Sequence, residues 1–205
     1  MTAADEATPK AAITPSQAVG PFHSGALFPP AGGTGTGAGH PGALVLHGHL
    51  LDGAGQGVPD AVIEAWRPVP YDTGTGTGTG TGSPDSAHPI AATGRSSASP
   101  IGFSRAATDG DGHYTLHIPP RYALPAHGVP YIPLMIFAPE LLRHLCTRAY
   151  PHDAPGLDED RLLARVPGSR RATLITRPDA PRVHRFDIRL QSDDEREETV
   201  FLDFT

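Results

Sequence analysis

The sequence predicts an all-β protein with a β-sandwich core, long glycine-rich loops and one or two short helices. Two observations support this fold class. Glycine (24) and proline (23) together exceed a fifth of the 205 residues, which favours many turns and short strands. Short runs with alternating apolar and polar residues also recur between turn signals, as in β-sandwiches.

Alternation and apolar runs locate the expected strands along the chain. Strands are expected in segments 43–52, 58–68, 113–119, 131–138, 182–190 and 199–204. In the third of these, Tyr114, Leu116 and Ile118 face one way, opposite the intervening polar residues. In the fifth, Val183, Phe186, Ile188 and Leu190 form the apolar side, with a slip near His184.

Turn and helix signals fill the connections between these strands. The sequence AGQG at 54–57 is a turn, and the two Asp-Gly pairs in TDGDG (108–112) predict a hairpin turn. Pro133 places its strand at a sheet edge or a bulge, because proline cannot donate to a ladder. Short helices are expected only over 139–145 and 158–166.

One domain, from residue 14 to 205, accounts for the length. Residues 1–13 read as a flexible tail. Two low-complexity segments, 31–42 and the Thr-Gly repeat within 73–86, have almost nothing to bury and are expected to be surface loops.

Charge and cysteine usage narrow the class of protein. The net charge of −6 without a basic stripe argues against nucleic-acid binding. No segment has the roughly 20 apolar residues that cross a bilayer, and the first residues do not resemble a secretory signal. The single cysteine, Cys146, excludes an internal disulfide and fits a reducing cytoplasm.

Histidines at strand spacing are the first candidates for a metal site. His47 and His49 share a strand face, a spacing that can hold a metal, but no third ligand is evident nearby. His113 and His117 also share a face, opposite the apolar one. Solvent-facing histidines are the favoured interpretation of both pairs.

Three other candidates also have simpler explanations. Asp109 and Asp111 resemble a calcium loop but lack the EF-hand spacing, so a turn explains them better. Arg170 and Arg171 could clamp a carboxylate, although a surface ion pair is commoner. Cys146 is interpreted as an inert buried thiol. Considered by themselves, the residues give a β-sandwich without a convincing catalytic group.

Several separate stretches together carry a resemblance to a known family. They are TPSQAVGPF (14–22), HGHLLDGAGQGVPDAVIEAWRP (47–68), GFSRAATDGDGHYTLHIPP (102–120), PYIPLMIFAPELLRHLCTRAYP (130–151), RRATLI (170–175) and the pair RFDIRLQ and ETVFLDF near the end. In order and spacing they resemble the intradiol ring-cleaving dioxygenases, and within them the alpha chains that act on protocatechuate. Apart from the glycine-rich insertions, the resemblance covers residues 14–205.

The resemblance implies an activity that is shared between two homologous chains. The catalytic beta chain holds Fe(III) with two tyrosines and two histidines, and its His-Ile-His corresponds to Tyr131-Ile132-Pro133 here. Tyr131 could bind ferric iron as a phenolate, but proline offers no donor at all, so the expectation is an iron-free alpha chain that is inactive alone. With an iron-bearing beta subunit, in alpha-beta protomers of a larger oligomer, it would cleave protocatechuate with O2 to 3-carboxy-cis,cis-muconate in the beta-ketoadipate pathway of aromatic compound catabolism.

The same resemblance implies which residues reach the substrate. Thr14, Gly20 and Pro21 correspond to an N-terminal segment that lines the partner's pocket. The family has an arginine near the substrate carboxylate in a Phe-Ala-Arg-Gly turn, where this chain has Pro139 followed by Glu140. Arg143, four residues after Pro139, is a candidate replacement for the missing charge.

Two other functions remain open from the sequence. The first is a free-standing, non-catalytic β-sandwich binding module, although such modules lack the N-terminal and C-terminal signatures found here. The second is a self-sufficient dioxygenase with relocated ligands, which would give the purified single chain a red-brown colour.

Overall fold

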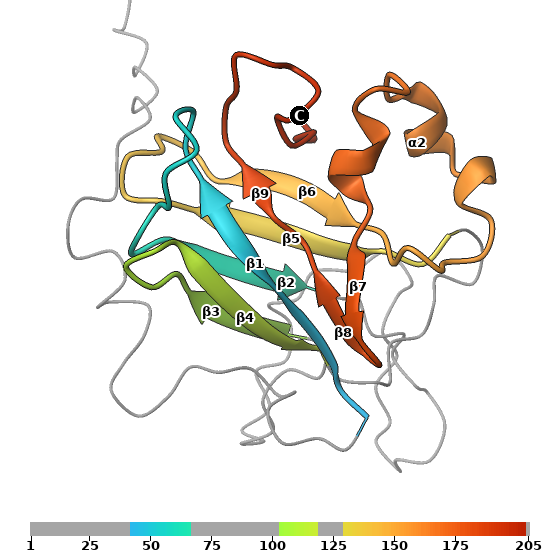
Figure 1. Ribbon diagram of the computed structural model, residues 1–205, viewed down its shortest axis with the longest axis horizontal. Helices are drawn as coiled ribbons and strands as arrows, with labels where there is room; N and C mark the ends of the chain where they lie inside the picture. The colour runs from blue at the N-terminus through green and yellow to red at the C-terminus, as the bar shows by residue number, and fades with distance from the viewer. Residues whose placement is uncertain (1–41, 67–102, 119–128, 204–205) are drawn as a thin grey trace, which may run out of the picture.

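Two β-sheets face each other in the computed structural model, which describes residues 42–66, 103–118 and 129–203 (Figure 1). The first sheet has the order β4 (His113–Ile118), β1 (Leu44–Leu51), β8 (Val183–Arg185) and β7 (Arg177–Ala180), with β9 (Ile188–Arg189) also paired to β1. The second has the order β3 (Phe103–Ala107), β2 (Val62–Trp66), β5 (Ile132–Phe137) and β6 (Leu145–Ala149). The predicted all-β sandwich is confirmed.

The core lies between the two sheets and is built by alternation along each strand. The first sheet contributes Leu46, Leu50, Tyr114, Leu116, Ile118, Phe186 and Ile188, and the second contributes Ile63, Ala65, Ala106, Ile132, Leu134 and Ile136. Each large side chain buried in this way stabilises the fold by about 1.5–3 kcal/mol. Because the side-chain period of a strand is two, the intervening residues face outward and are available for other tasks.

The two glycine-rich turns connect the sheets to each other. The turn at 54–57 leads from β1 in the first sheet to β2 in the second, and residues 108–112 lead from β3 back to β4. The Asp109 carboxylate accepts the backbone N–H groups of Asp111 (3.0 Å) and His113 (2.8 Å), which fixes the second turn. The turn prediction for 108–112 is therefore confirmed, but the prediction of a hairpin is wrong, because β3 and β4 belong to different sheets.

Pro133 lies in an inner strand, so the prediction of an edge strand is wrong. β5 pairs with β2 on one side and β6 on the other. The β2 ladder runs only from Val62–Phe137 to Ala65–Leu134, while Pro133 is paired with Arg148 on β6. The proline therefore lies just beyond the last rung of the β2 ladder, where a missing N–H leaves no gap in it.

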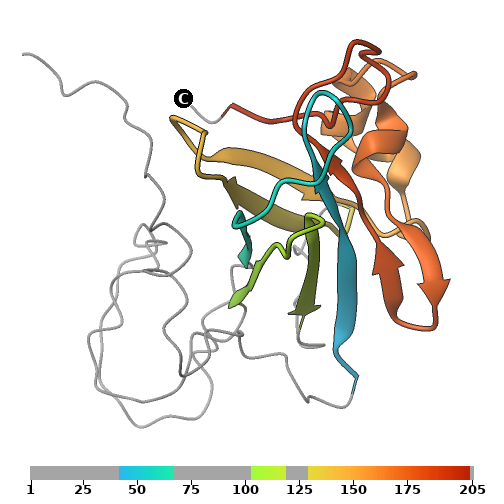
Figure 2. The same cartoon turned by 60° about the vertical axis from the view of Figure 1, so that its left-hand side comes forward.

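The predicted helix over 158–166 forms as two short pieces, η1 (Leu157–Glu159) and α2 (Arg161–Arg165). Asp160 divides them, because its carboxylate accepts the N–H groups of Leu162 (2.8 Å) and Leu163 (2.9 Å) and so caps α2. With η2 (Arg171–Leu174), these helices lie together at one end of the sandwich (Figure 2). They enclose a second, smaller cluster made of Val129, Tyr150, Leu163, Val166 and Leu174.

The helix predicted over 139–145 is absent, and the segment is the turn between β5 and β6. Ile136 pairs with Leu145, so the chain has to reverse direction between these two residues. The N–H of Leu141 donates to the carbonyl of Ala138 (3.1 Å) within this turn. Strand pairing has overridden the local helix preference.

The strand predicted over 182–190 divides into β8 and β9, and the register differs at its start. His184, Phe186 and Ile188 are the buried residues, and Leu190 packs against the core. The alternation predicts Val183 on the apolar side, but it is only partly buried. The apparent slip in the pattern reflects a histidine that occupies a core-facing position.

The last described residues form no regular strand, contrary to the prediction for 199–204. They run extended between the sheets. The N–H of Thr199 donates to the carbonyl of Arg189 (3.1 Å) beside β9, and the N–H of Leu202 donates to the carbonyl of Cys146 (2.8 Å) on β6. The hydroxyl of Thr147 donates to the carbonyl of Val200 (2.8 Å).

The predicted tail (1–13) and low-complexity segments (31–42 and 73–86) lie outside the described residues, apart from Gly42. Their assignment to one domain stays a prediction. Within the described ranges, no helix is long and apolar enough to span a membrane.

Candidate functional site

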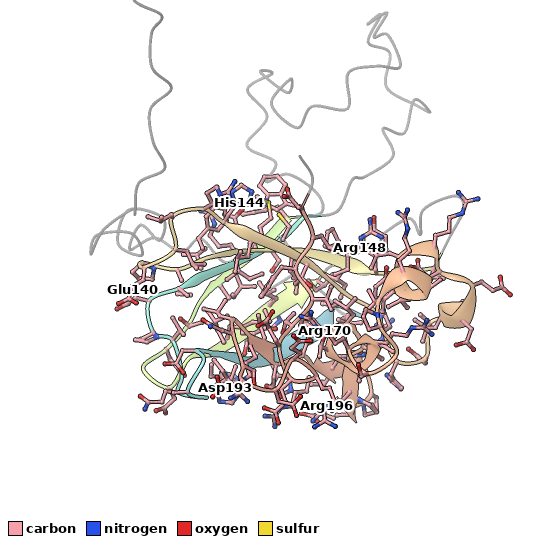
Figure 3. All side chains as sticks on the ribbon, turned by 90° about the horizontal axis from the view of Figure 1, so that it is seen from above. Glu140, His144, Arg148, Arg170, Asp193 and Arg196 are labelled. Atoms are coloured by element: carbon pink, nitrogen blue, oxygen red, sulfur yellow. The ribbon has the colours of Figure 1, made fainter. Side chains whose placement is uncertain are left out.

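The outer face of the four-stranded sheet carries a hollow of about 390 Å³. It is lined by Trp66, Tyr131, Pro133, Leu134, Met135, His144, Cys146, Thr147 and Arg148. The β5–β6 register places Pro133 opposite Arg148 and Met135 opposite Cys146, so strand alternation brings these side chains together. Figure 3 shows His144 and Arg148 on the same, upper side of the molecule.

A buried carboxylate supports one wall of this hollow. Glu64 on β2 is only 5% exposed, although it points away from the core. It accepts hydrogen bonds from the Trp66 indole N–H (2.7 Å) and from the Arg105 guanidinium, whose Nε lies at 2.7 Å. The Trp66 ring packs on Phe103 with a centroid distance of 4.5 Å. A buried charge that is both paired and hydrogen-bonded in this way fixes the orientation of Trp66.

A second group of contacts holds Tyr131 at the other end of the hollow. The Arg148 guanidinium lies 4.0 Å from the centroid of the Tyr131 ring, and Tyr131 packs on Tyr150 with centroids 5.7 Å apart. Arg148 also donates to the Tyr150 hydroxyl (3.4 Å), which donates to Asp160 (3.1 Å). Burial raises the pKa of Tyr150 to about 12, against an opposing effect of Arg148. The hydroxyl of Tyr150 is therefore neutral at physiological pH.

Cys146 lines the hollow but is poorly suited to act as a nucleophile. Its side chain is partly buried, and burial raises the pKa of its thiol. The reactive thiolate is correspondingly scarce near neutral pH. The prediction of an inert thiol agrees with this, although the side chain is less buried than expected.

A smaller hollow of about 260 Å³ lies against the β5–β6 turn. It is lined by Phe137, Ala138, Leu141, Leu142, Arg143 and His144. Two basic side chains therefore border an apolar depression directly after Pro139, which is itself partly exposed. Leu142 is 60% exposed, the one large apolar side chain so exposed among the described residues.

The remaining sequence hypotheses are resolved by the contacts of the side chains. His47, His49, His113 and His117 all face outward, as predicted. Arg170 pairs with Glu198 (3.2 Å), so the ion-pair interpretation is confirmed for that residue. Arg171 instead donates to the carbonyl of Val166 (3.2 Å).

A comparison with curated proteins identifies the relatives of this chain. No protein-family profile matches it. The protocatechuate 3,4-dioxygenase alpha chain of Burkholderia cepacia is 34% identical over 209 residues, which span 93% of this chain and 96% of the relative.

The chain belongs to the protocatechuate 3,4-dioxygenase alpha-chain family.

Solved structures of other dioxygenases are similar in outline. The dioxygenase domain of a dioxygenase carbohydrate-binding fusion from Streptomyces sp. SirexAA-E is 18% identical, with a TM-score of 0.49, covering 87% of this chain and 99% of that one. An intradiol ring-cleavage dioxygenase from Tetranychus urticae is 14% identical, with a TM-score of 0.49, covering 75% and 83%. Catechol 1,2-dioxygenase from Acinetobacter sp. ADP1 is 19% identical, with a TM-score of 0.47, covering 84% and 60%.

The residues of the larger hollow do not fit the ferric ion expected in a catalytic chain of this family. Tyr131 and Pro133, which the family resemblance equates with two histidine ligands, both line the hollow. Proline has no side-chain donor. The Arg148 guanidinium over the Tyr131 ring adds a positive charge where a trivalent cation would need anionic ligands. Within the described part of the chain, no three His, Cys, Asp or Glu side chains converge on a point that could hold a metal.

Of the four predicted substrate contacts, only Pro139 lies in the described part of the chain. Thr14, Gly20 and Pro21 lie outside it. Sequence reasoning did not assign a role to Arg148, although alternation places it on the same face as Cys146. The contact of Arg148 with Tyr131 depends on the path of the chain just before β5, which no local sequence pattern reveals.

Proposed function

We propose that this chain is the iron-free alpha subunit of a protocatechuate 3,4-dioxygenase. The observation that carries the proposal is that this chain is related to an alpha chain along nearly its whole length. The chemistry of the larger hollow supports it, because Pro133 cannot bind a metal and Arg148 repels one. The Fe(III) then resides in a homologous beta subunit, with which this chain forms alpha-beta protomers in a larger oligomer.

The proposed role of this subunit is to complete a pocket on its partner. Thr14, Gly20 and Pro21 are proposed to contact protocatechuate there, with Gly20 allowing a close approach of backbone and Pro21 fixing its direction. Pro139 is proposed to lie near the same pocket. Because it replaces an arginine, the chain has to recognise the carboxylate of the substrate differently. Arg143, on the wall of the smaller hollow, supplies a positive charge close to this turn.

The proposed reaction opens the ring of protocatechuate between its two hydroxylated carbons. O2 supplies both oxygen atoms, and the product is 3-carboxy-cis,cis-muconate, an intermediate of the beta-ketoadipate pathway. The single cysteine supports a reducing compartment, which we propose to be the cytoplasm.

Reconstitution tests the division of labour between the two chains. The chain should be purified alone, the iron-bearing partner alone, and the two together, each assayed for iron by elemental analysis and for O2 uptake with protocatechuate. We expect iron only where the partner is present and full activity only for the pair. About one iron for each isolated chain, or turnover by the isolated chain, would contradict the proposal.

A substitution at Gly20 tests the shared pocket separately. In the assembled enzyme, Gly20→Leu should raise KM for protocatechuate while iron content stays unchanged, because the metal ligands belong to the partner. Gly110→Leu is the matched control, since nothing lies within 4 Å of the position its Cβ would take. If Gly20→Leu kept the KM and kcat of the parent enzyme, this chain would be a scaffold only.

A further inference from the structure

Three histidines gather on the outer face of the five-stranded sheet, away from the hollows described above. His49 on β1 is directly opposite His113 on β4, and His47 is two residues along the same face of β1. The His113 ring lies 5.1 Å from the His49 ring and 5.7 Å from the His47 ring, centroid to centroid. The sequence showed the His47–His49 pair without a third partner, and strand pairing supplies one.

These separations match those of imidazoles around a shared zinc ion. Zinc binds histidine nitrogens at about 2.0–2.1 Å in a tetrahedral arrangement, which places the ring centres roughly 5 Å apart. A His-x-His pair on one antiparallel strand with a third histidine on its neighbour presents three rings on one surface without any change in the backbone. One tetrahedral position then remains for water or a carboxylate.

One carboxylate already engages a ring in the manner of a supporting residue at a metal site, and a second lies close to another ring. Asp179 Oδ2 lies 2.8 Å from His47 Nε2, and Asp187 Oδ1 lies 3.7 Å from His49 Nδ1. A metal-bound histidine usually donates its other ring N–H to a carboxylate, which fixes the tautomer and orients the ring. In His47, Nδ1 is therefore the ring nitrogen left for a metal.

The charges around the three rings favour a cation. Arg185 pairs with His47 in the β1–β8 register, and its guanidinium is held by Asp187 at 2.9 Å. Asp109 lies beside His113, accepting that residue's backbone N–H at 2.8 Å. The carboxylates of Asp109, Asp179 and Asp187 therefore lie beside the three histidines. His47 and His49 are 22% and 36% exposed at their side chains, so an ion can reach them from solvent.

We propose that His47, His49 and His113 bind one zinc(II) ion on the outer face of the five-stranded sheet. In the structure as it stands, no three such donors among the described residues yet converge on one point. Rotation about the side-chain torsions of partly exposed histidines is fast, and χ2 has a broad energy profile, so the rings can turn together as the ion binds. The ion would join β4, an edge strand, to β1.

Zinc titration of the full-length, tag-free protein tests this site. Isothermal titration calorimetry with zinc chloride should give one saturable site per chain, and cobalt(II) in its place should give the intense visible absorption of tetrahedral coordination. His113→Ala and His49→Ala should each weaken binding at least tenfold. Asp179→Asn should weaken it about tenfold, through loss of the carboxylate behind His47.

His117→Ala is the matched control, because His117 lies on the same face of β4 but pairs with Val45, four residues before His49 on β1. It should bind zinc as the parent protein does. Far-UV circular dichroism confirms that each variant is folded. Absence of saturable binding would overturn the proposal. So would unchanged binding in folded His113→Ala, or an equal loss in His117→Ala. None of these outcomes depends on the proposed dioxygenase role, which the activity assays test.

Discussion

At the scale of single residues, His184 is a histidine in a position that faces the core. Its Nδ1 lies 2.9 Å from the hydroxyl oxygen of Thr176, and its ring packs on His152 with centroids 5.3 Å apart. Burial lowers the pKa of His184 and the neighbouring His152 lowers it further, while Asp153 acts in the opposite direction. The neutral imidazole is therefore the form that the folded chain accommodates.

This environment predicts acid sensitivity that can be assigned to one side chain. The pKa of His184 is below 6.5 in the folded state and close to 6.5 in the unfolded state, so the unfolded chain takes up the proton first as pH falls. The contribution of His184 to stability is present above about pH 6.5 and is lost as pH falls towards its folded pKa. Urea unfolding at about pH 7.5 and pH 5.5 should show a smaller loss of stability in His184→Gln than in the parent chain.

The exposed His144 provides the comparison. His144→Gln should lose stability between the two pH values as the parent chain does. If the His184→Gln and parent curves were parallel, His184 would not be the residue that titrates.

At the scale of elements, the gap between β8 and β9 is set by one glycine of β1. A Cβ on Gly48 would lie 2.1 Å from the carbonyl oxygen of Phe186, closer than any real contact. The same carbonyl accepts a hydrogen bond from the buried hydroxyl of Tyr114 (2.5 Å), and the N–H of Phe186 donates to the backbone carbonyl of His47 (2.7 Å). Residues 186–187 can therefore lie this close to β1 only because residue 48 has no side chain.

Gly48→Ala should consequently be strongly destabilising. The added methyl would push residues 186–187 away from β1, with a loss of about 2–4 kcal/mol in the free energy of unfolding. Urea denaturation measures this loss. Gly110→Ala, at a turn where a Cβ meets nothing within 4 Å, should change stability by less than about 1 kcal/mol. Equal stability of the two variants would show that the Phe186 carbonyl moves aside freely.

At the scale of the whole molecule, the final described residues fasten one sheet to the other. Thr199 is 1% exposed, and its hydroxyl accepts the N–H of Arg189 at 2.9 Å beside β9. Three residues later, Leu202 bonds to Cys146 on β6. The segment thus closes one side of the sandwich without belonging to either sheet.

A chain truncated after Glu198 should lose the hydrogen bonds by which this segment links the two sheets. Removal of the buried Thr199 and of these hydrogen bonds should cost about 2–3 kcal/mol, which lowers the melting temperature by roughly 5–10 °C in a domain of this size. Shortening the Thr-Gly repeat at 73–82 is the comparison, because loop closure depends weakly on length and the change should stay within about 1 kcal/mol. A truncated chain that melts with the parent would show that the segment contributes no net stability.

Local patterns in the sequence were sufficient to predict the fold class and the lack of a metal-binding side chain at Pro133. Alternation placed Tyr114, Leu116 and Ile118 inward, and the chemistry of Pro133 was evident without coordinates. What local patterns could not supply is which strand lies beside which. The proximity of His113 to His49 follows from the β1–β4 register, and the core-facing position of His184 follows from its pairing with the buried Leu46.

The parallel pairing of β1 with β8 has a consequence for the synthesis of this protein. The N–H of His49 bonds to the Asp187 side chain, a residue 138 positions later in the chain. At about 5–20 residues per second, a ribosome takes on the order of ten seconds to make the intervening chain. Throughout that time one edge of β1 has no native neighbour, although β4 has already emerged. Nascent chains should therefore keep an open strand edge, prone to wrong pairing, until residues 183–189 have emerged from the ribosome.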